Sequence, residues 1–273
     1  MVSDKVILIT GGAGSLGQAL VKELLKHNPK SIRIFDQSEY ALWDMQRHFS
    51  EKNIRFLVGD VRDRDRLYRA CVGVDIIVHA AALKHVPMCE YNPIEAVKTN
   101  ILGSINIIDA SLDRGVDKVL AISSDKAVHP INLYGATKLT MEKLFTHANV
   151  YGDTRFSCVR FGNFKGSIGS VLPLWYKQIE EGKKITVTEK EMTRFWITLD
   201  KAAEFVIKCI DMIKGGEIFI PKMPRVELSE LINSIAPDAK LEIIGGRAGE
   251  KLSELLFNEG ESPIDCGDYY LIK

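Results

Sequence analysis

Short apolar segments alternate with longer segments of helical periodicity over the first 160 residues, and this alternation constrains the fold more than any other feature. Such a βαβα series with nearly continuous apolar strands predicts an α/β fold, a parallel sheet with helices on both faces. Strands that run into Gly- or Asp-containing turns favour the doubly wound (Rossmann) form. The strand-like segments are Val6–Thr10, Ile32–Phe35, Arg55–Val58, Asp75–His79, Val119–Ile122 and Phe156–Arg160. The helix-like segments are Leu16–Lys26, Tyr40–Phe49, Asp65–Cys71, Ile94–Arg114 and Tyr134–Asn149.

The pattern becomes irregular after residue 160, where we expect a smaller region. Gly162–Gly169 is rich in Gly, Asn and Ser, and prolines recur towards the C-terminus. A helix-like segment at Asp200–Ile213 and a short strand at Glu217–Ile220 predict that residues 196–220 rejoin the sheet. We therefore predict a nucleotide-binding Rossmann domain over residues 1–160 and a smaller, substrate-binding region over residues 161–273.

A glycine-rich turn follows the first apolar segment and precedes the first helical one. Its spacing is Gly11-x-x-Gly14-x-x-Gly17, with Ser15 and Leu16 opening the helix. Glycines allow a tight turn and a close approach of the backbone to a pyrophosphate, and the helix N-terminus offers unpaired N–H groups to it. The position at the first strand-to-helix junction favours dinucleotide binding over a glycine turn without a ligand.

Asp36 ends the second strand-like segment, about 20 residues beyond the glycine turn, where an acidic residue binds the adenosine ribose hydroxyls. A carboxylate there repels a 2′-phosphate, so the sequence favours NAD, with NADP as the alternative. A helix N-cap role for Asp36 or Ser38 is a competing interpretation.

Two later strand ends supply further candidate cofactor contacts. Asp60 and Val61 follow the third strand-like segment, and Ala80 and Ala81 follow the fourth. We expect the Asp60 carboxylate to bind the adenine amine, and the small alanines to let a flat cofactor approach the backbone.

Tyr134 and Lys138 lie four residues apart and therefore share one face of a predicted helix. A neighbouring ammonium and an oxidised nicotinamide would both stabilise the tyrosine phenolate, whose usual pKa is about 10. Tyr134 could then accept a proton from a substrate hydroxyl. A Tyr-x-x-x-Lys spacing also occurs by chance, but its place behind the fifth strand-like segment favours the catalytic interpretation.

Composition narrows the classes of partner. Lys+Arg and Asp+Glu both number 36, so no global positive field attracts nucleic acid or anionic lipid. The cysteines form no Cys-x-x-Cys pair, which predicts reduced thiols in a cytoplasmic protein and no metal site. No uncharged apolar segment approaches the about 20 residues of a membrane span, and the N-terminus does not resemble a signal peptide.

The chain resembles the extended short-chain dehydrogenases/reductases and, among them, the UDP-N-acetylglucosamine 4,6-dehydratases of polysaccharide biosynthesis. The resemblance covers nearly the whole chain in the family's order, and its later motifs are far more specific than the glycine turn. The matching stretches are Thr10–Gly17, His79–Pro93, Ser123–Leu139, Arg160–Pro173, Met192–Thr198, Gly215–Pro224 and Gly246–Glu254.

The resemblance assigns the elimination of water to Asp125 and Lys126. Oxidation of the sugar at C4, with Tyr134 and Lys138, gives a ketone that acidifies the C5 proton. Lys126 is then the base at C5 and Asp125 the acid that helps the C6 hydroxyl leave, before hydride returns to C6. An exposed Asp-Lys pair in a loop is the alternative that composition alone would favour.

The resemblance also implies that the C-terminal half binds a UDP-sugar. Matching motif positions are Asn163, Arg194, Arg247 and Glu250, and Lys84 is expected to line the sugar site. Guanidinium groups suit a diphosphate because they present a planar fork of donors. The competing interpretations are a surface charge for Arg194 and a simple ion pair with Lys251 for Glu250.

The resemblance points in two directions on C5 stereochemistry. Tyr134 is typical of C5-inverting relatives, whereas Ser123–Asp125 and Phe35–Ser38 resemble the retaining, NAD-using branch. Two other functions remain open: a UDP-sugar 4-epimerase, which returns hydride to C4, and a non-catalytic nucleotide-binding regulator. We also expect a homo-oligomer that pairs through helices over Asn92–Arg114 and Tyr134–Asn149.

Overall fold

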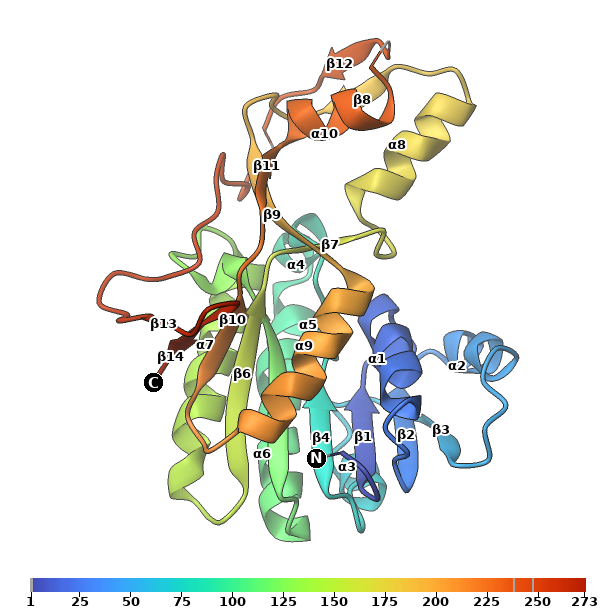
Figure 1. Cartoon of the computed structure of the whole chain (residues 1–273), viewed down its shortest axis with the longest axis vertical. Helices are drawn as coiled ribbons and strands as arrows, with labels where there is room; N and C mark the ends of the chain where they lie inside the picture. The colour runs from blue at the N-terminus through green and yellow to red at the C-terminus, as the bar shows by residue number, and fades with distance from the viewer. Residues whose placement is uncertain (1, 238, 247) are drawn as a thin grey trace.

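The computed structural model describes residues 2–237, 239–246 and 248–273. Within these residues, the main sheet has the strand order β13-β14-β10-β6-β5-β4-β1-β2-β3 (Figure 1). Its strands are β1 (Val6–Thr10), β2 (Ser31–Asp36), β3 (Ile54–Val58), β4 (Ile76–His79), β5 (Lys118–Ser124), β6 (Arg155–Phe161), β10 (Ile218–Pro221), β13 (Ile264–Asp265) and β14 (Tyr269–Ile272). The strands from β3 to β10 in this order pair in parallel, which confirms the predicted doubly wound α/β fold.

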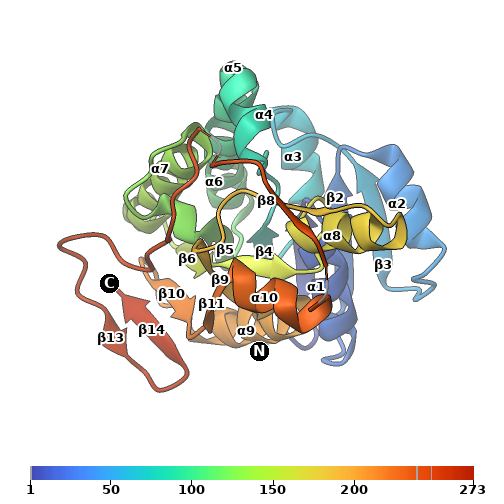
Figure 2. The ribbon, with the colours of Figure 1, turned by 90° about the horizontal axis from the view of Figure 1, so that it is seen from above.

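Helices cover both faces of this sheet. Figure 2 shows α1 and α9 on one side, and α3, α6 and α7 on the other. The bounds are α1 (Ser15–Leu25), α2 (Glu39–Gln46), α3 (Arg64–Ala70), α4 (Val86–Tyr91), α5 (Pro93–Val97), α6 (Gly103–Arg114), α7 (Leu133–His147) and α9 (Leu199–Met212). Central strands β1 and β4 are buried over their whole length, because both of their neighbours and both helical layers exclude water.

Helix starts follow local capping chemistry. The side chains of Ser38, Asp63, Asn132 and Thr198 each accept a hydrogen bond from a backbone N–H in the first turn of the following helix. Such side chains satisfy N–H groups that have no partner inside the helix. The cap at Asn132 fixes the first turn of α7, in which Tyr134 lies.

Two features differ from the sequence-based prediction. The helical segment Ile94–Arg114 is not uniform, because a π-helix at Lys98–Leu102 separates α5 from α6. There the Asn100 side chain exchanges hydrogen bonds with the backbone of Leu83 and donates to Thr137, and such π turns often lie at functional sites. In addition, β14 pairs antiparallel with β10, and β13 pairs antiparallel with β14 at the sheet edge.

The smaller region lies beyond the carboxyl ends of the parallel strands (Figure 1). It contains β7 (Asn163–Lys165), β9 (Thr193–Thr198) and β11 (Arg225–Glu227) in one sheet, β8 (Ile185–Val187) and β12 (Leu241–Ile243) in another, and helices α8 (Val171–Glu180) and α10 (Leu228–Ile235). It has its own apolar core around Trp175, Met192, Trp196 and Leu231. Residues after 160 thus contribute to both parts, and the predicted division at residue 160 stays a prediction.

A buried charged cluster joins β6 and α7 to the C-terminal segment that carries Glu261. The Arg160 guanidinium on β6 donates to both carboxylate oxygens of Glu142 on α7 and to both of Glu261. Burial alone would raise the pKa of Glu261, but hydrogen bonds from Arg160 and from the backbone N–H of Asn258 outweigh it and lower this pKa to about 2. The cluster therefore stabilises the fold only while Glu261 is ionised.

This cluster predicts a specific loss of stability in acid. The pKa of Glu261 is lower in the folded state than its usual 4.5, so its contribution is complete above pH 4.5 and disappears as the pH falls towards about 2. We expect Glu261→Gln to reduce the free energy of unfolding by between about 1 and 3 kcal/mol at neutral pH and much less at about pH 3. Urea unfolding at both pH values measures this, with Glu259→Gln on the exposed part of the same segment as control. An equal loss at both pH values would contradict the role of the Glu261 charge.

Candidate active site

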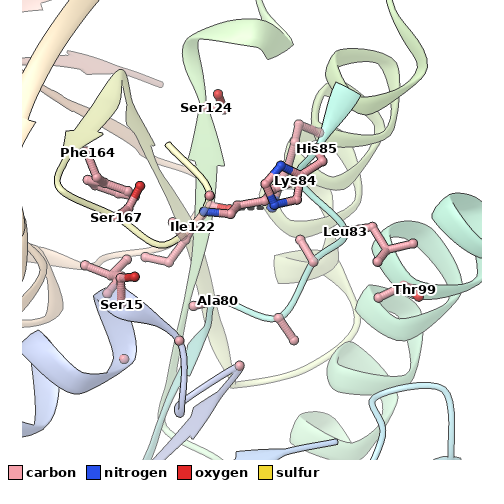
Figure 3. A pocket seen from close by; sticks show the side chains of 18 of the residues that line it. Ser15, Ala80, Leu83, Lys84, His85, Thr99, Ile122, Ser124, Phe164 and Ser167 are labelled. Atoms are coloured by element: carbon pink, nitrogen blue, oxygen red, sulfur yellow. Dashed lines mark hydrogen bonds between the residues drawn. The ribbon is translucent and has the colours of Figure 1, made fainter. Parts of the chain in front are cut away.

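A cavity of about 520 Å³ opens where the carboxyl ends of the parallel strands meet the smaller region, which is the usual place for ligands in such folds. Figure 3 shows Ser15, Phe164 and Ser167 on one side of β5, and Leu83, Lys84 and His85 on the other. The sequence-predicted site residues that line the cavity are Gly11, Gly14, Ser15, Leu16, Gly17, Asp36, Asp60, Val61, Ala80, Ala81, Lys84, Lys126, Tyr134, Lys138 and Asn163.

Two positions of the glycine turn, Gly11 and Gly17, have no room for a side chain. Gly11 has φ +65°, and a Cβ atom there would lie 2.7 Å from the backbone nitrogen of Ala81. A Cβ at Gly17 would lie 2.2 Å from the carbonyl oxygen of Gly12, so the helix could not begin so close to the strand. The turn thus brings backbone and helix N-terminus to the cavity wall, a geometry that fits a pyrophosphate.

Both carboxylates expected at the adenosine end line the cavity. Asp36 accepts hydrogen bonds from the backbone N–H groups of Ala13 (3.1 Å) and Ser38 (3.0 Å), so it also ties the glycine turn to β2. Ser38 is the N-cap of α2, so the capping role considered for Asp36 or Ser38 belongs to Ser38, and Asp36 remains the candidate for binding the ribose hydroxyls. Asp60 already forms an ion pair with Arg62 at 2.6 Å.

Tyr134 and Lys138 lie in the first turns of α7 and are both buried. The Lys138 ammonium donates to the carbonyl oxygen of Ile122 on β5 at 2.8 Å, and burial lowers its pKa to about 8. Burial also raises the pKa of Tyr134 above its usual range; a hydrogen bond with Ser124 opposes this rise, and the charge of Asp125 adds to it. The Tyr134 phenol therefore needs a further positive charge nearby before it can act as a base.

Asp125 and Lys126 form a 3-10 turn directly after β5, and they are not the exposed loop pair that composition would favour. Asp125 is fully buried, and the Lys126 side chain is 20% exposed. The Lys126 ammonium lies 3.1 Å from Asp125 Oδ1 and 3.3 Å from Asn163 Oδ1. The second Asp125 oxygen is buried and has no hydrogen-bond partner among the residues that the structure describes, although buried polar atoms are nearly always hydrogen-bonded. Lys126 lines the cavity and its partly open amine suits a polar substrate, with the Asp125 carboxylate directly behind it.

Two side chains of this site were not among the residues predicted from the sequence. Ser124 donates to Asp125 Oδ1 at 3.0 Å and accepts from the Lys126 backbone N–H, so it fixes the turn. Glu254 is buried and lies 3.8 Å from the Lys126 ammonium. The signal for Glu254 was its place at the end of the recognised stretch Gly246–Glu254, but nothing in the sequence indicated which part of the fold this stretch would contact.

The loop after β7 extends over the cavity. The backbone N–H of Ile168 donates to the Ser15 hydroxyl (2.9 Å), and its carbonyl oxygen accepts from the Lys84 ammonium (2.7 Å). Gly169 packs against His85, where a Cβ would lie 2.4 Å from the imidazole. The loop therefore joins the glycine turn to the segment after β4, and it places Lys84 at the cavity.

The remaining predicted substrate residues lie elsewhere or outside the described residues. Arg194 is buried rather than a surface charge, and its guanidinium donates to the carbonyl oxygens of Thr193 and Leu252. Lys251 forms its ion pair with Glu254 at 3.2 Å and not with Glu250. One buried Glu250 oxygen has no hydrogen-bond partner within residues 2–237, 239–246 and 248–273. Arg247 falls outside the described residues.

Comparison with known proteins identifies relatives along the whole chain. A family described as polysaccharide biosynthesis protein matches residues 7–273. A Campylobacter jejuni protein named UDP-N-acetylglucosamine 4,6-dehydratase (inverting) is 46% identical, over 100% of this chain and 84% of the relative. The X-ray structure of Pen from Bacillus thuringiensis superposes with a TM-score of 0.96 at 43% identity, over 100% of this chain and 87% of that chain.

Two other relatives carry different names. A Methanocaldococcus jannaschii protein named as an uncharacterized membrane protein is 50% identical, over 94% of this chain and 82% of the relative. A Rickettsia akari protein named UDP-glucose 4-epimerase is 39% identical, over 100% and 84%. Among the described residues of this chain, we find no helix with the length and apolar character that crossing a bilayer requires.

The glycine turn predicts a sharp dependence of dinucleotide binding on Gly17. In Gly17→Ala the new methyl group meets a backbone oxygen, so the turn and helix must separate, at a cost of about 1 to 3 kcal/mol. We expect the dissociation constant for NAD to rise by about tenfold or more, as measured by calorimetric titration. Gly152→Ala, in an exposed turn where the nearest atom is the end of the Leu112 side chain, is the matched control. Unchanged NAD affinity in Gly17→Ala would show that the turn does not bind the cofactor.

Proposed function

The chain belongs to the polysaccharide biosynthesis protein family, and from this premise we propose that it is a UDP-N-acetylglucosamine 4,6-dehydratase that inverts C5. One observation carries the proposal: Lys126, Tyr134 and Lys138 line the same cavity, and the buried Asp125 carboxylate lies 3.1 Å from the Lys126 ammonium. An acid, an amine and a phenol are the groups that oxidation at C4 and elimination across C5 and C6 require.

The first step is oxidation at C4, for which the residues at the N-terminus of α7 are suited. Tyr134 takes the proton of the C4 hydroxyl, and Lys138, whose pKa is about 8, supports the phenolate from the same helix face. The glycine turn and Asp36 would hold NAD, which would accept the hydride from C4, return it to C6 and add positive charge near Tyr134. The Tyr134 phenol is buried where such a charge would favour its phenolate.

The second step removes water. The C4 ketone acidifies the C5 proton; the Lys126 amine takes this proton first, and the C5–H electron pair passes into the enolate. The C5–C6 double bond then forms as the C6–O bond breaks, and the oxygen leaves as water with a proton from Asp125. Over both events Lys126 gains one proton and Asp125 loses one, so the total charge of the pair is restored at the end.

NAD is the proposed cofactor in preference to NADP. Asp36 lines the cavity beyond the glycine turn, and its carboxylate would repel a 2′-phosphate. At the sugar end, Lys84 and Asn163 are the proposed contacts, while Arg194, Arg247 and Glu250 remain predicted contacts of the UDP moiety. A cytoplasmic location likewise stays a prediction, supported by the free cysteines.

Incubation with UDP-N-acetylglucosamine in deuterated water, followed by NMR and mass spectrometry, tests the function. We expect a product lighter by one water, with deuterium at C5 and the inverted configuration there. A C4 epimer of unchanged composition would instead support the epimerase named among the relatives. A product that retains the C5 configuration would still support dehydratase activity but would contradict the proposed inversion at C5.

Lys126→Ala tests the assigned base. We expect the rate of C5 exchange and water loss to fall by about two orders of magnitude or more, because the general base is missing. Formation of the reduced cofactor in a single turnover should fall far less, since Tyr134 and Lys138 remain. The exposed Lys190→Ala is the control for the loss of a lysine. Normal C5 exchange in Lys126→Ala would remove this residue from its role.

A homo-oligomer is the proposed assembly, with apolar side chains on the surface of α4, α5 and the π-helix as its contact. Met88, Tyr91, Ile94 and Leu102 are exposed here, and the relative exposure of Tyr91 is 85%. Exposed apolar patches of this kind are typical of protein interfaces. We expect Ile94→Glu to give a smaller species in light scattering than the unmodified chain, at equal concentration. Ile243→Glu, at an exposed position in β12, should not; a monomeric unmodified chain would contradict the assembly.

A further inference from the structure

A second carboxylate faces the amine of Lys126. Asp125 Oδ1 lies 3.1 Å from this nitrogen, and Glu254 Oε1 lies 3.8 Å from it. Both carboxylates are buried, at 0% and 3% exposure of their side chains. The Glu254 distance exceeds that of a direct hydrogen bond, so its interaction with Lys126 is that of two charges in a poorly hydrated site.

Lys251 balances the charge of Glu254. Its ammonium lies 3.2 Å from the other Glu254 oxygen, and it also donates to the carbonyl oxygen of Val128 at 2.6 Å. The four side chains Asp125, Lys126, Glu254 and Lys251 thus pair two acids with two amines. An ionised Glu254 therefore keeps a partner whether or not Lys126 carries a proton, which a buried carboxylate requires.

The chain segment that carries Glu254 is held against the start of α7, against β6 and against β9. Asn132, the cap of α7, donates to the carbonyl oxygen of Gly249 at 2.7 Å. Arg160 donates to the carbonyl oxygen of Leu256 at 2.6 Å, and the Thr193 and Ser253 hydroxyls are hydrogen-bonded at 2.9 Å. Glu254 is therefore held at a defined place beside Lys126 by contacts on both sides of it.

We propose that Glu254, held and charge-balanced by Lys251, is a positioning residue that supports Lys126 during removal of the C5 proton; this inference rests on the proposed function. Asp125 must still hold its own proton at that moment, because it later gives it to the C6 oxygen. A protonated Asp125 cannot compensate the positive charge that develops on Lys126. The Glu254 carboxylate can, since it lies 3.8 Å from the Lys126 ammonium and has the Lys251 ammonium as its counter-charge.

The proposal predicts that Glu254→Gln affects C5 chemistry and leaves C4 oxidation largely intact. Gln has nearly the same shape and lacks the charge. With the full chain, NAD and UDP-N-acetylglucosamine in deuterated water, we expect C5 deuterium incorporation and water loss to slow by about tenfold or more, which corresponds to about 1.4 kcal/mol. Single-turnover formation of reduced cofactor should change by less than about threefold, and the KM should change less than kcat. Glu254→Asp, which keeps the charge, should recover part of the loss, and exposed Glu259→Gln should behave as the unmodified chain.

A double substitution separates charge balance from structural support. Lys251→Met leaves Glu254 without its counter-charge, so we expect it to slow C5 exchange; Lys251→Met combined with Glu254→Gln should be less impaired than the sum of the single effects. Additive losses, or equal losses in C4 oxidation and C5 exchange, would overturn the proposal. So would full C5 exchange in Glu254→Gln. If the unmodified chain itself does not exchange C5 or lose water, the proposed function fails, which is a different outcome from failure of the Glu254 role alone.

Discussion

One buried guanidinium holds the parts of the site in register. Arg160 lies at the end of β6 and binds Glu142 on α7, Glu261, and the backbone of Leu256. Helix α7 carries the phenol and amine at its N-terminal end, and the C-terminal segment carries Glu254. A fully buried arginine is costly without partners, so these elements are held where they satisfy it. Through Arg160 the sheet thus determines both the position of α7 and the path of the C-terminal segment that carries Glu254.

Burial then determines the chemistry that these groups can perform. Burial raises the Tyr134 pKa, which favours the neutral phenol, whereas the Lys138 pKa falls only to about 8, so this group is still mostly an ammonium at neutral pH. A neutral phenol is a poor base, and a positive cofactor ring would make it a good one. On this basis oxidation at C4 is coupled to the presence of the oxidised cofactor, and the site stays inactive towards a sugar that arrives without it.

The sequence allowed most of the framework to be predicted, because strand burial and glycine geometry are local properties. Val6–Ile9 is apolar at every position, and the glycine at position 17 stands in a recognisable spacing, so both features could be identified from the sequence. The contacts of Arg194 and Glu254 could not be identified from the sequence, because they depend on how the short, irregular elements after residue 160 pack against the rest of the fold. The antiparallel strands β13 and β14 escaped prediction for the same reason: their pairing joins residues distant in sequence with no strong periodicity. The π turn at Lys98–Leu102 depends on Asn100 bonding to Leu83, a contact that helical periodicity cannot indicate.

The fold by itself does not separate a dehydratase from an epimerase, since both oxidise C4 over the same glycine turn. The difference must come from groups that act at C5 and C6. In this chain the groups that we propose for this role stand on a single 3-10 turn whose first residue is buried and whose second is 20% exposed. The buried residue has an unpartnered oxygen, and the exposed one has carboxylates on two sides. An epimerase needs neither a buried acid with a free oxygen nor a compensated amine, and burying them without use would cost stability. The polar turn after β5 is therefore the part of the structure that argues for elimination. The surrounding Rossmann fold positions the groups proposed for oxidation at C4, and this oxidation forms the ketone on which elimination depends.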